Sequence, residues 1–202
     1  AEVEVELREF IENSFEEMQS TELALKLLDK LEVVLQRDSL RKDLADKYSL
    51  IFQYYGGELE AVQELYDVQK TKPPLARNMP PVSGNILWAR HLLTKIEEPM
   101  QRFQSNKVIS GSQESKRVIK LYNKMARTLV EFETLWFRAW ERSVESSKEG
   151  LQATLICRHP EDPNRLCVNF DPQVTQLIRE AKVMHRMGMK LSDQAQLILL
   201  QE

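Results

Sequence analysis

The residues that could bind a metal ion are few and widely spaced. The chain holds three histidines, at positions 91, 159 and 185, and two cysteines, Cys157 and Cys167. Structural zinc sites usually draw paired ligands that lie about two to four residues apart, whereas these cysteines are ten residues apart. We therefore expect the five side chains to be ordinary packing or surface residues, and the sequence predicts no metal site.

Motifs for nucleotide binding and acyl transfer are also missing from the sequence. It contains no glycine-rich loop ending in Lys-Ser or Lys-Thr, no Gly-x-Ser-x-Gly and no Gly-x-Gly-x-x-Gly after a predicted strand. Such motifs supply the backbone donors or the exposed nucleophile of these reactions, so we predict no catalytic residue and no cofactor. The rival interpretation is a helical enzyme or a nucleotide-exchange domain, which would require polar residues that converge in a pocket.

Four basic residues form a row on one face of a predicted helix: Lys116, Lys120, Lys124 and Arg127. Such rows are usually solvated, but this row could also pair with an acidic helix, for example the Glu-rich opening of the same chain. Nucleic acid fits poorly as a partner, because no aromatic residues that could stack on nucleobases alternate with the four basic residues. The net charge of -3 gives no further reason to expect it.

The opening of the chain is strongly acidic. Residues 1–18 contain seven glutamates and one arginine, which suits the start of a helix and also leaves a negative outer face. We predict that this face contacts a partner, with Glu9, Glu12 and Glu16 as its candidate contact residues.

The tryptophans follow the apolar spacing of the predicted helices. Trp88 and Trp140 are interpreted first as core residues for this reason, although either ring could instead anchor an interface. Truncating a buried aromatic residue usually costs about 3–5 kcal/mol. We expect Phe132 and Trp136 to be the positions where substitution harms the fold most.

Residues 72–81 contain four prolines, which remove backbone donors and disfavour helical geometry in the residues before them. We predict a stiff polyproline II connector here, and a docking ligand for an aromatic groove is the alternative. Arg77 lies in this connector and is a further candidate contact residue.

Apolar residues recur every three or four positions over most of the chain, which predicts long amphipathic helices. The expected helices cover about residues 2–36, 39–71, 82–105 and 110–150. Gly56-Gly57 indicates a kink or a close helix contact, and Pro99 indicates a kink or a stop. Ser110 and Gln113 have capping-box spacing at the start of the fourth helix.

The strongest β signal lies between residues 153 and 170. The stretches 153–157 and 166–170 are short and apolar and flank a turn-rich loop, which predicts a hairpin. An isolated hairpin is marginal in water, so this one is either a corner between bundles or an edge that receives a partner strand. Asp171-Pro172 should start a helix that Gly188 ends, and Ser192 should cap the last helix.

These elements predict a mainly α fold of elongated consecutive helical bundles with one β-hairpin insertion at about residues 153–170. We divide the chain into a first helical segment, 1–105, and a second segment, 106–202. With 42% hydrophobic and 29% charged residues, the composition excludes collagen and disulfide scaffolds. There is no run of about 18 apolar residues, so we expect no membrane contact. The absence of an initiator Met and the unfinished helix at residues 197–202 lead us to expect a fragment of a longer protein.

Two separated stretches resemble the N-terminal tail region of axonemal dynein heavy chains. The first is KPPLARNMPPVSGNILWAR at residues 72–90, followed by IEEPM at 96–100 and Phe103. The second is LICRHP at 155–160, VNFDP at 168–172 and LIREAK at 177–182, followed by MG at 187–188. The motifs are similar to the family in content and order over about residues 40–202. Among the heavy chains, the resemblance favours one of the outer arm.

This resemblance implies a segment of a microtubule motor that moves toward the minus end. In this family the tail anchors the motor to ciliary cargo, holds heavy chains together and binds intermediate chains, while the ATPase ring lies far downstream. By resemblance we therefore expect a non-catalytic scaffold in the cytoskeleton of the cilium or flagellum axoneme, with heavy and intermediate chains as partners. Axonemal microtubules would be contacted only indirectly. A spectrin-like cytoskeletal adaptor is the runner-up, but the sequence shows no long internal repeat.

Overall fold

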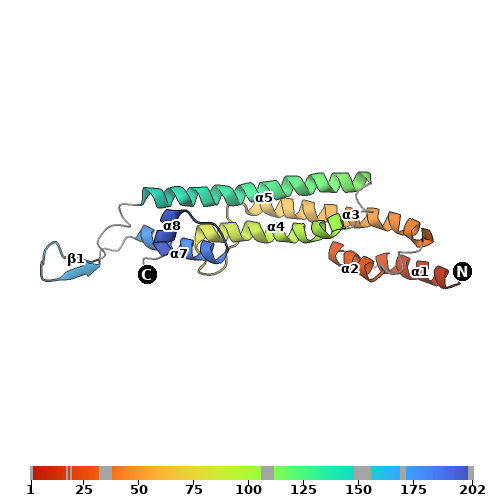
Figure 1. The fold of residues 1–202 in the computed structure, drawn as a ribbon, viewed down its shortest axis with the longest axis horizontal. Helices are drawn as coiled ribbons and strands as arrows, with labels where there is room; N and C mark the ends of the chain where they lie inside the picture. Colours follow the sequence, from red (N-terminus) through yellow and green to blue (C-terminus); the bar gives the residue numbers. More distant parts are fainter. Residues whose placement is uncertain are drawn as a thin grey trace. The chain divides into compact units, whose positions relative to one another are not determined.

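The computed structural model is mainly α-helical, as predicted (Figure 1). It describes residues 2–16, 18, 20–31, 38–105, 112–147, 156–168 and 172–199. The helices of this part of the chain are α1 (Glu2–Glu16), α2 (Thr21–Leu31), α3 (Asp38–Gln69), α4 (Pro81–Ser105), α5 (Gln113–Ser146), α7 (Pro172–Arg186) and α8 (Asp193–Leu199). The strands are β1 (Ile156–Arg158) and β2 (Leu166–Val168). Within those ranges, no helix combines the length and the apolar character that a membrane crossing requires.

The contacts group the residues into two compact units. Unit 1 comprises Ala1–Lys72 and His91–Leu129, and unit 2 comprises Pro73–Arg90 and Val130–Glu202. The predicted segments, 1–105 and 106–202, are consecutive in the sequence, whereas each unit draws residues from both. This happens because α4 and α5 each contribute one part to unit 1 and another part to unit 2.

The opening of the chain forms two helices where we predicted one over residues 2–36. The backbone N–H of Met18 donates to the carbonyl of Phe15 at 3.3 Å, which closes the last turn of α1. The Oγ of Ser20 accepts a hydrogen bond from the N–H of Leu23 at 3.4 Å, as an N-cap does. The apolar spacing continues across this break, and periodicity alone therefore hid it. Residues 32–36 lie outside the described ranges.

The core of unit 1 joins α3 to α4. The ring of Phe103 packs against the rings of Phe52 and Tyr55, with centroids 4.9 and 5.3 Å apart. The buried hydroxyl of Tyr55 donates to the carbonyl of Ile96 at 2.6 Å, and burial raises the pKa of this phenol. Pro99 does not end α4, because the helix is held on both sides of it by buried residues such as Ile96 and Phe103.

The glycine pair lies inside α3, which continues through it. A Cβ atom at Gly56 would lie 3.7 Å from Cγ2 of Val118 on α5, which is an ordinary van der Waals distance, so the predicted close helix contact does not require glycine there. Nothing lies within 4 Å of the same position at Gly57. Each glycine costs about 1 kcal/mol relative to alanine in a helix interior.

The helix α5 begins slightly later than predicted. The Oγ of Ser112 accepts a hydrogen bond from the N–H of Ser115 at 3.0 Å, which makes Ser112 the observed cap. The predicted cap, Ser110, and the predicted stop, Gly150, lie outside the described residues.

The Pro-rich connector folds back on the start of α4. It turns at Arg77-Asn78, where Asn78 has a φ of 64°, so it is not one continuous polyproline II segment. A Cβ atom at Gly84 would lie 3.0 Å from Cγ of Met79 and 3.1 Å from Cδ1 of Leu75. A side chain at position 84 would therefore require Met79 and Leu75 to shift by a few tenths of an ångström.

The core of unit 2 lies between the first part of α4, the last part of α5, and the helices α7 and α8. Its buried residues are Ile86, Trp140, Val144, Leu177, Ala181, Met184, Leu191 and Ala195. The predicted boundaries are confirmed: α7 starts at Pro172, Gly188 follows its end with a φ of 72°, and the Oγ of Ser192 accepts from the N–H of Ala195 at 3.4 Å. Asp171 itself lies outside the described residues.

The predicted hairpin is confirmed over the residues that the structure describes. β1 and β2 are antiparallel, and Cys157 lies opposite Cys167 as a pair of free thiols. Ile156, Leu166 and Val168 are exposed. The remaining residues of the predicted strands, 153–155 and 169–170, lie outside the described ranges.

We expect Trp140→Ala to lower the free energy of unfolding by about 3–5 kcal/mol, because this side chain is only 2% exposed. Phe132 and Trp136, which we predicted to be most sensitive, are only half-buried, so their truncation should cost less. Urea denaturation followed by circular dichroism measures these changes. Leu135→Ala is the matched control on the same helix, because Leu135 is 65% exposed, and it should change the free energy by less than about 0.5 kcal/mol. Equal losses at positions 135 and 140 would contradict the assigned core.

Candidate functional site

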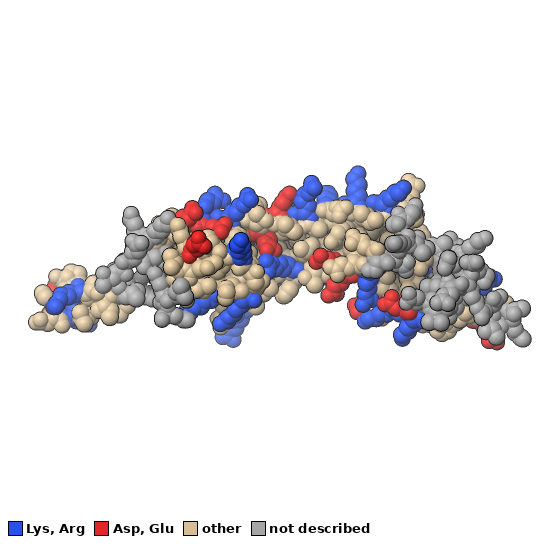
Figure 2. Space-filling view, viewed as in Figure 1, with Lys and Arg blue, Asp and Glu red and all other residues tan. Residues whose placement is uncertain are grey.

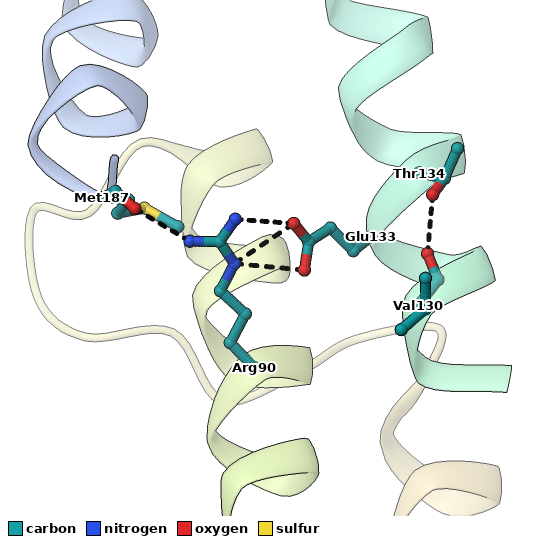
Figure 3. A network of polar contacts seen from close by, with 5 residues as sticks. All are labelled: Arg90, Val130, Glu133, Thr134 and Met187. Carbon is teal, nitrogen blue, oxygen red and sulfur yellow. Dashed lines mark hydrogen bonds and ion pairs between the residues drawn. The ribbon is translucent and has the colours of Figure 1, made fainter. Parts of the chain in front are cut away.

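Arg90 on α4 links three parts of unit 2 (Figure 3). Its Nη2 lies 2.7 Å from Oε1 of Glu133 on α5, and its Nε donates to both carboxylate oxygens at 3.1 Å. Its Nη1 donates to the carbonyl of Met187, just after α7, at 3.0 Å. The side chains of Arg90 and Glu133 are only 32% and 21% exposed. This shielded, forked pair therefore holds its geometry better than an exposed ion pair would.

Glu180 on α7 is a buried carboxylate, only 1% exposed. Its Oε1 accepts from the N–H of Val82 at 2.8 Å, and its Oε2 accepts from the N–H of Ser83 at 2.7 Å and from the Ser83 hydroxyl. These N–H groups belong to the first turn of α4, where no helical carbonyl can accept them. Glu180 thus caps α4 from another helix, and its charge is favoured at the positive end of the helix dipole.

Unit 1 uses the same arrangement on a smaller scale. The N–H of Thr21, the first residue of α2, donates to Oε1 of Glu58 on α3 at 3.0 Å. In both units, a carboxylate on one helix fixes the point where another helix begins.

Neither Arg90 nor Glu180 was among the residues that we predicted to be functional. The signal for Glu180 was present in the sequence, because it shares the apolar spacing of Leu177, Ala181 and Met184 on α7. A carboxylate at such a position must find hydrogen-bond donors when it is buried. Its partners, which are 97 and 98 residues away, could not be read from that spacing.

These polar groups bond to one another and stabilise helix joints. Within the described ranges, no three His, Cys, Asp or Glu side chains gather closely enough to hold a metal ion. His91 and His185 are exposed and lie on different helices, in different units. Most of the predicted contact residues lie on the charged surface.

The predicted basic row lies on the exposed face of α5 in unit 1. Figure 2 shows Lys and Arg side chains along α5, at the top of the view. The row consists of Lys116, Lys120, Lys124 and Arg127, which are all exposed. The structure thus brings the four predicted side chains together on one face.

The predicted acidic residues Glu9, Glu12 and Glu16 are exposed on α1. Among the described residues they form no ion pair with the basic row, so the pairing within one chain that we considered is not seen. Instead, Arg117 of α5 lies 3.6 Å from Glu60 of α3. Both charged faces remain open to solvent.

Trp88 and Trp140 are buried, as the core interpretation predicts, and their alternative role as interface anchors stays a prediction. The ring of Trp88 packs edge-on against Phe132, with centroids 5.6 Å apart. The apolar spacing that suggested a core position gave the correct answer for both tryptophans.

Arg77 is exposed at the turn of the connector. Close to it in sequence, Asn78 and Met79 line a surface groove of about 590 Å³ in unit 2, together with Thr175 and Arg179 of α7. This groove lies between the connector and α7. No aromatic side chain is among the residues that line it.

The fold and the surface together define a class of protein. It is a mainly α-helical protein in which distant carboxylates cap helix starts and charged faces lie on the surface.

Comparison with known proteins names the family. The family model described as "Dynein heavy chain, N-terminal region 1" matches residues 1–202, so this chain belongs to that family. It is 50% identical over 200 residues to the dynein gamma chain of the flagellar outer arm of Chlamydomonas reinhardtii, which covers 99% of this chain and 4% of that protein. It is 42% identical over 197 residues to human dynein axonemal heavy chain 8, covering 98% of this chain and 4% of that protein. It is 41% identical over 191 residues to dynein axonemal heavy chain 5 of Rattus norvegicus, covering 95% of this chain and 5% of that protein.

We expect Glu180→Ala to lower the free energy of unfolding by about 2–4 kcal/mol, because it leaves the buried N–H of Ser83 and the part-buried N–H of Val82 without an acceptor. Urea denaturation of the 202-residue chain measures this loss. Glu145→Ala is the matched control, since Glu145 is exposed on α5, and it should change the free energy by less than about 0.5 kcal/mol. If both variants unfold at the same urea concentration as the unmodified chain, Glu180 does not hold α4 in place.

Proposed function

We propose that this chain is a non-catalytic tail segment of an axonemal dynein heavy chain that scaffolds accessory chains and transmits force. The observation that carries this proposal is the match of the family model to residues 1–202. The similarity to the gamma chain of the flagellar outer arm supports an outer-arm chain. The site of action is then the axoneme of the cilium or flagellum.

The chain spans only 4–5% of the length of these relatives, so the activity of the whole protein is a proposal as well. We infer that the parent is a microtubule motor directed to the minus end, with its ATPase in AAA modules outside this segment. The sequence of this segment contains no phosphate-binding loop. The comparisons give the spectrin-like alternative no support.

The internal structure supports a mechanical role. The long helices α3, α4 and α5 have 32, 25 and 34 residues, and a continuous hydrogen-bonded helix carries tension and compression along its axis. The Arg90 and Glu180 junctions tie the start of α4 to α5 and α7 within unit 2. A load that enters one helix is therefore shared with its neighbours.

The proposed partners are dynein intermediate chains and other heavy chains. The exposed basic row of α5 and the exposed acidic face of α1 are the proposed contact surfaces, and Arg77 on the connector is a third. Contacts between exposed charges speed association and fix its specificity, and they weaken as salt screens them.

Purification of the heavy chain with its intermediate chains at increasing salt tests this proposal. We expect the amount of intermediate chain retained to fall between about 50 and about 300 mM NaCl, because the Debye length shortens over this range. The triple variant Lys116→Glu, Lys120→Glu and Lys124→Glu should reduce retention at low salt by at least about tenfold.

The matched control reverses three exposed charges elsewhere: Arg165→Glu, Arg186→Glu and Lys190→Glu. It should retain intermediate chains like the unmodified protein. Equal retention across the whole salt range would remove the charged surfaces from the proposal. ATP hydrolysis by the isolated 202-residue chain would contradict the non-catalytic role itself.

A further inference from the structure

The glycine pair of α3 is not explained by the backbone of this chain. Gly56 and Gly57 lie in the interior of a 32-residue helix, where glycine is the least favourable residue apart from proline. Neither has a positive φ, because among the described glycines only Gly188 does. Alanine could therefore adopt the same backbone at both positions.

Packing within the chain does not explain the pair either. A Cβ atom at Gly57 would meet nothing within 4 Å. At Gly56 it would meet Cγ2 of Val118 at 3.7 Å, which is an ordinary van der Waals distance. The two glycines therefore lower the stability of the helix, and no contact within the described chain requires either of them.

The missing side chains open a pocket on the surface of unit 1, here called the glycine pocket. It lies between Gly56 and Gly57 of α3 and Val118 and Leu121 of α5, and its volume is about 220 Å³. Phe52, which is buried in the core, also lines it. This volume is below the range of about 300–1,000 Å³ that is usual for small-molecule sites, and it suits one large apolar side chain of a protein partner.

The charge beside the glycine pocket indicates the kind of partner. Residues 113–129 of α5 contain five Lys or Arg and one Glu. At the rim, Arg117 lies 3.6 Å from Glu60, but their side chains are 80% and 62% exposed, so this pair contributes little and is easily exchanged for another. The other four basic residues form the exposed row, and this side of the pocket therefore attracts acidic groups.

We propose that unit 1 binds an acidic amphipathic helix of a partner protein along the groove between α3 and α5. One large apolar side chain of that helix enters the glycine pocket, and the glycines let its backbone approach α3 closely. Carboxylates on one side of the helix face the basic row of α5. On the other side, Glu60 and Glu64 of α3 select a basic or neutral residue. This inference rests on the proposed scaffold function and names the chemistry of the partner that this surface takes.

Photo-crosslinking in the assembled complex tests the inference. The photoreactive residue p-benzoylphenylalanine replaces Glu114 at the rim of the pocket, in the full heavy chain, and mass spectrometry identifies the peptide that is captured. We expect a peptide from another subunit that is predicted to be helical, acidic on one face and apolar at its centre. The same residue in place of Lys95, which is exposed on α4 of the same unit, is the positional control and should not capture that peptide.

Filling the pocket supplies the second measurement. Gly57→Leu should occupy the glycine pocket and lower the yield of the Glu114 crosslink by at least about tenfold. Gly57→Ala leaves most of the pocket open and should keep the yield within about twofold of the unmodified heavy chain. Both substitutions favour the helix, so the thermal midpoint of unit 1 should not fall, and loss of crosslinking cannot then be attributed to misfolding.

The outcomes separate the two proposals. If the unmodified heavy chain copurifies with accessory chains and Gly57→Leu leaves the crosslink unchanged, the glycine-pocket inference is overturned and the scaffold function stands. A captured peptide that is basic, or that comes only from the same heavy chain, also overturns the inference. If no accessory chain copurifies with the unmodified heavy chain, both proposals fail.

Discussion

The packing of unit 2 depends on a charge placed where a helix begins. The carboxylate of Glu180 accepts hydrogen bonds from the first turn of α4, and this turn also receives the connector on Gly84. A helix start exposes donors that need acceptors, and a carboxylate from a distant helix satisfies them while fixing the distance between the two helices. Arg90 then fixes the next turns of α4 against α5 and the end of α7. The position of α4 in unit 2 therefore follows from polar groups as much as from apolar ones.

Much of the fold could be predicted from the sequence, because helix periodicity, proline and glycine act locally. The boundaries at Pro172, Gly188 and Ser192 follow from their own side chains or backbone freedom. The break between α1 and α2 could not be predicted from periodicity, since the apolar stripe runs across it. It depends partly on Glu58, which is 37 residues away from Thr21. Interactions at such separations leave no pattern in a single sequence.

The candidate site divides in the same way. The basic row of α5 was predictable, because residues four apart on a helix share a face and that face was free of apolar residues. Trp88 and Trp140 were also assigned correctly to the core, because their spacing matches the apolar stripes. The junctions of Arg90 and Glu180 combine residues from three helices, and only the tertiary structure brings them together. The resemblance of residues 72–90 to the dynein tail was visible in the sequence. The packing of the connector on Gly84 and the bonds of Arg90 to Glu133 and Met187 were visible only in the structure.

Gly84 illustrates how a substitution can strengthen one level of structure and damage another. Alanine there would favour the helical state of α4, yet its Cβ would lie only 3.0–3.1 Å from side-chain atoms of Met79 and Leu75, so these connector residues would have to shift by a few tenths of an ångström. A spectroscopic signal for helical content would then rise or stay constant while the packing of the connector on α4 was disturbed. The integrity of this segment has to be judged from the packing of the connector, for example by proteolysis at residues 73–80. Helical content alone would not detect the damage.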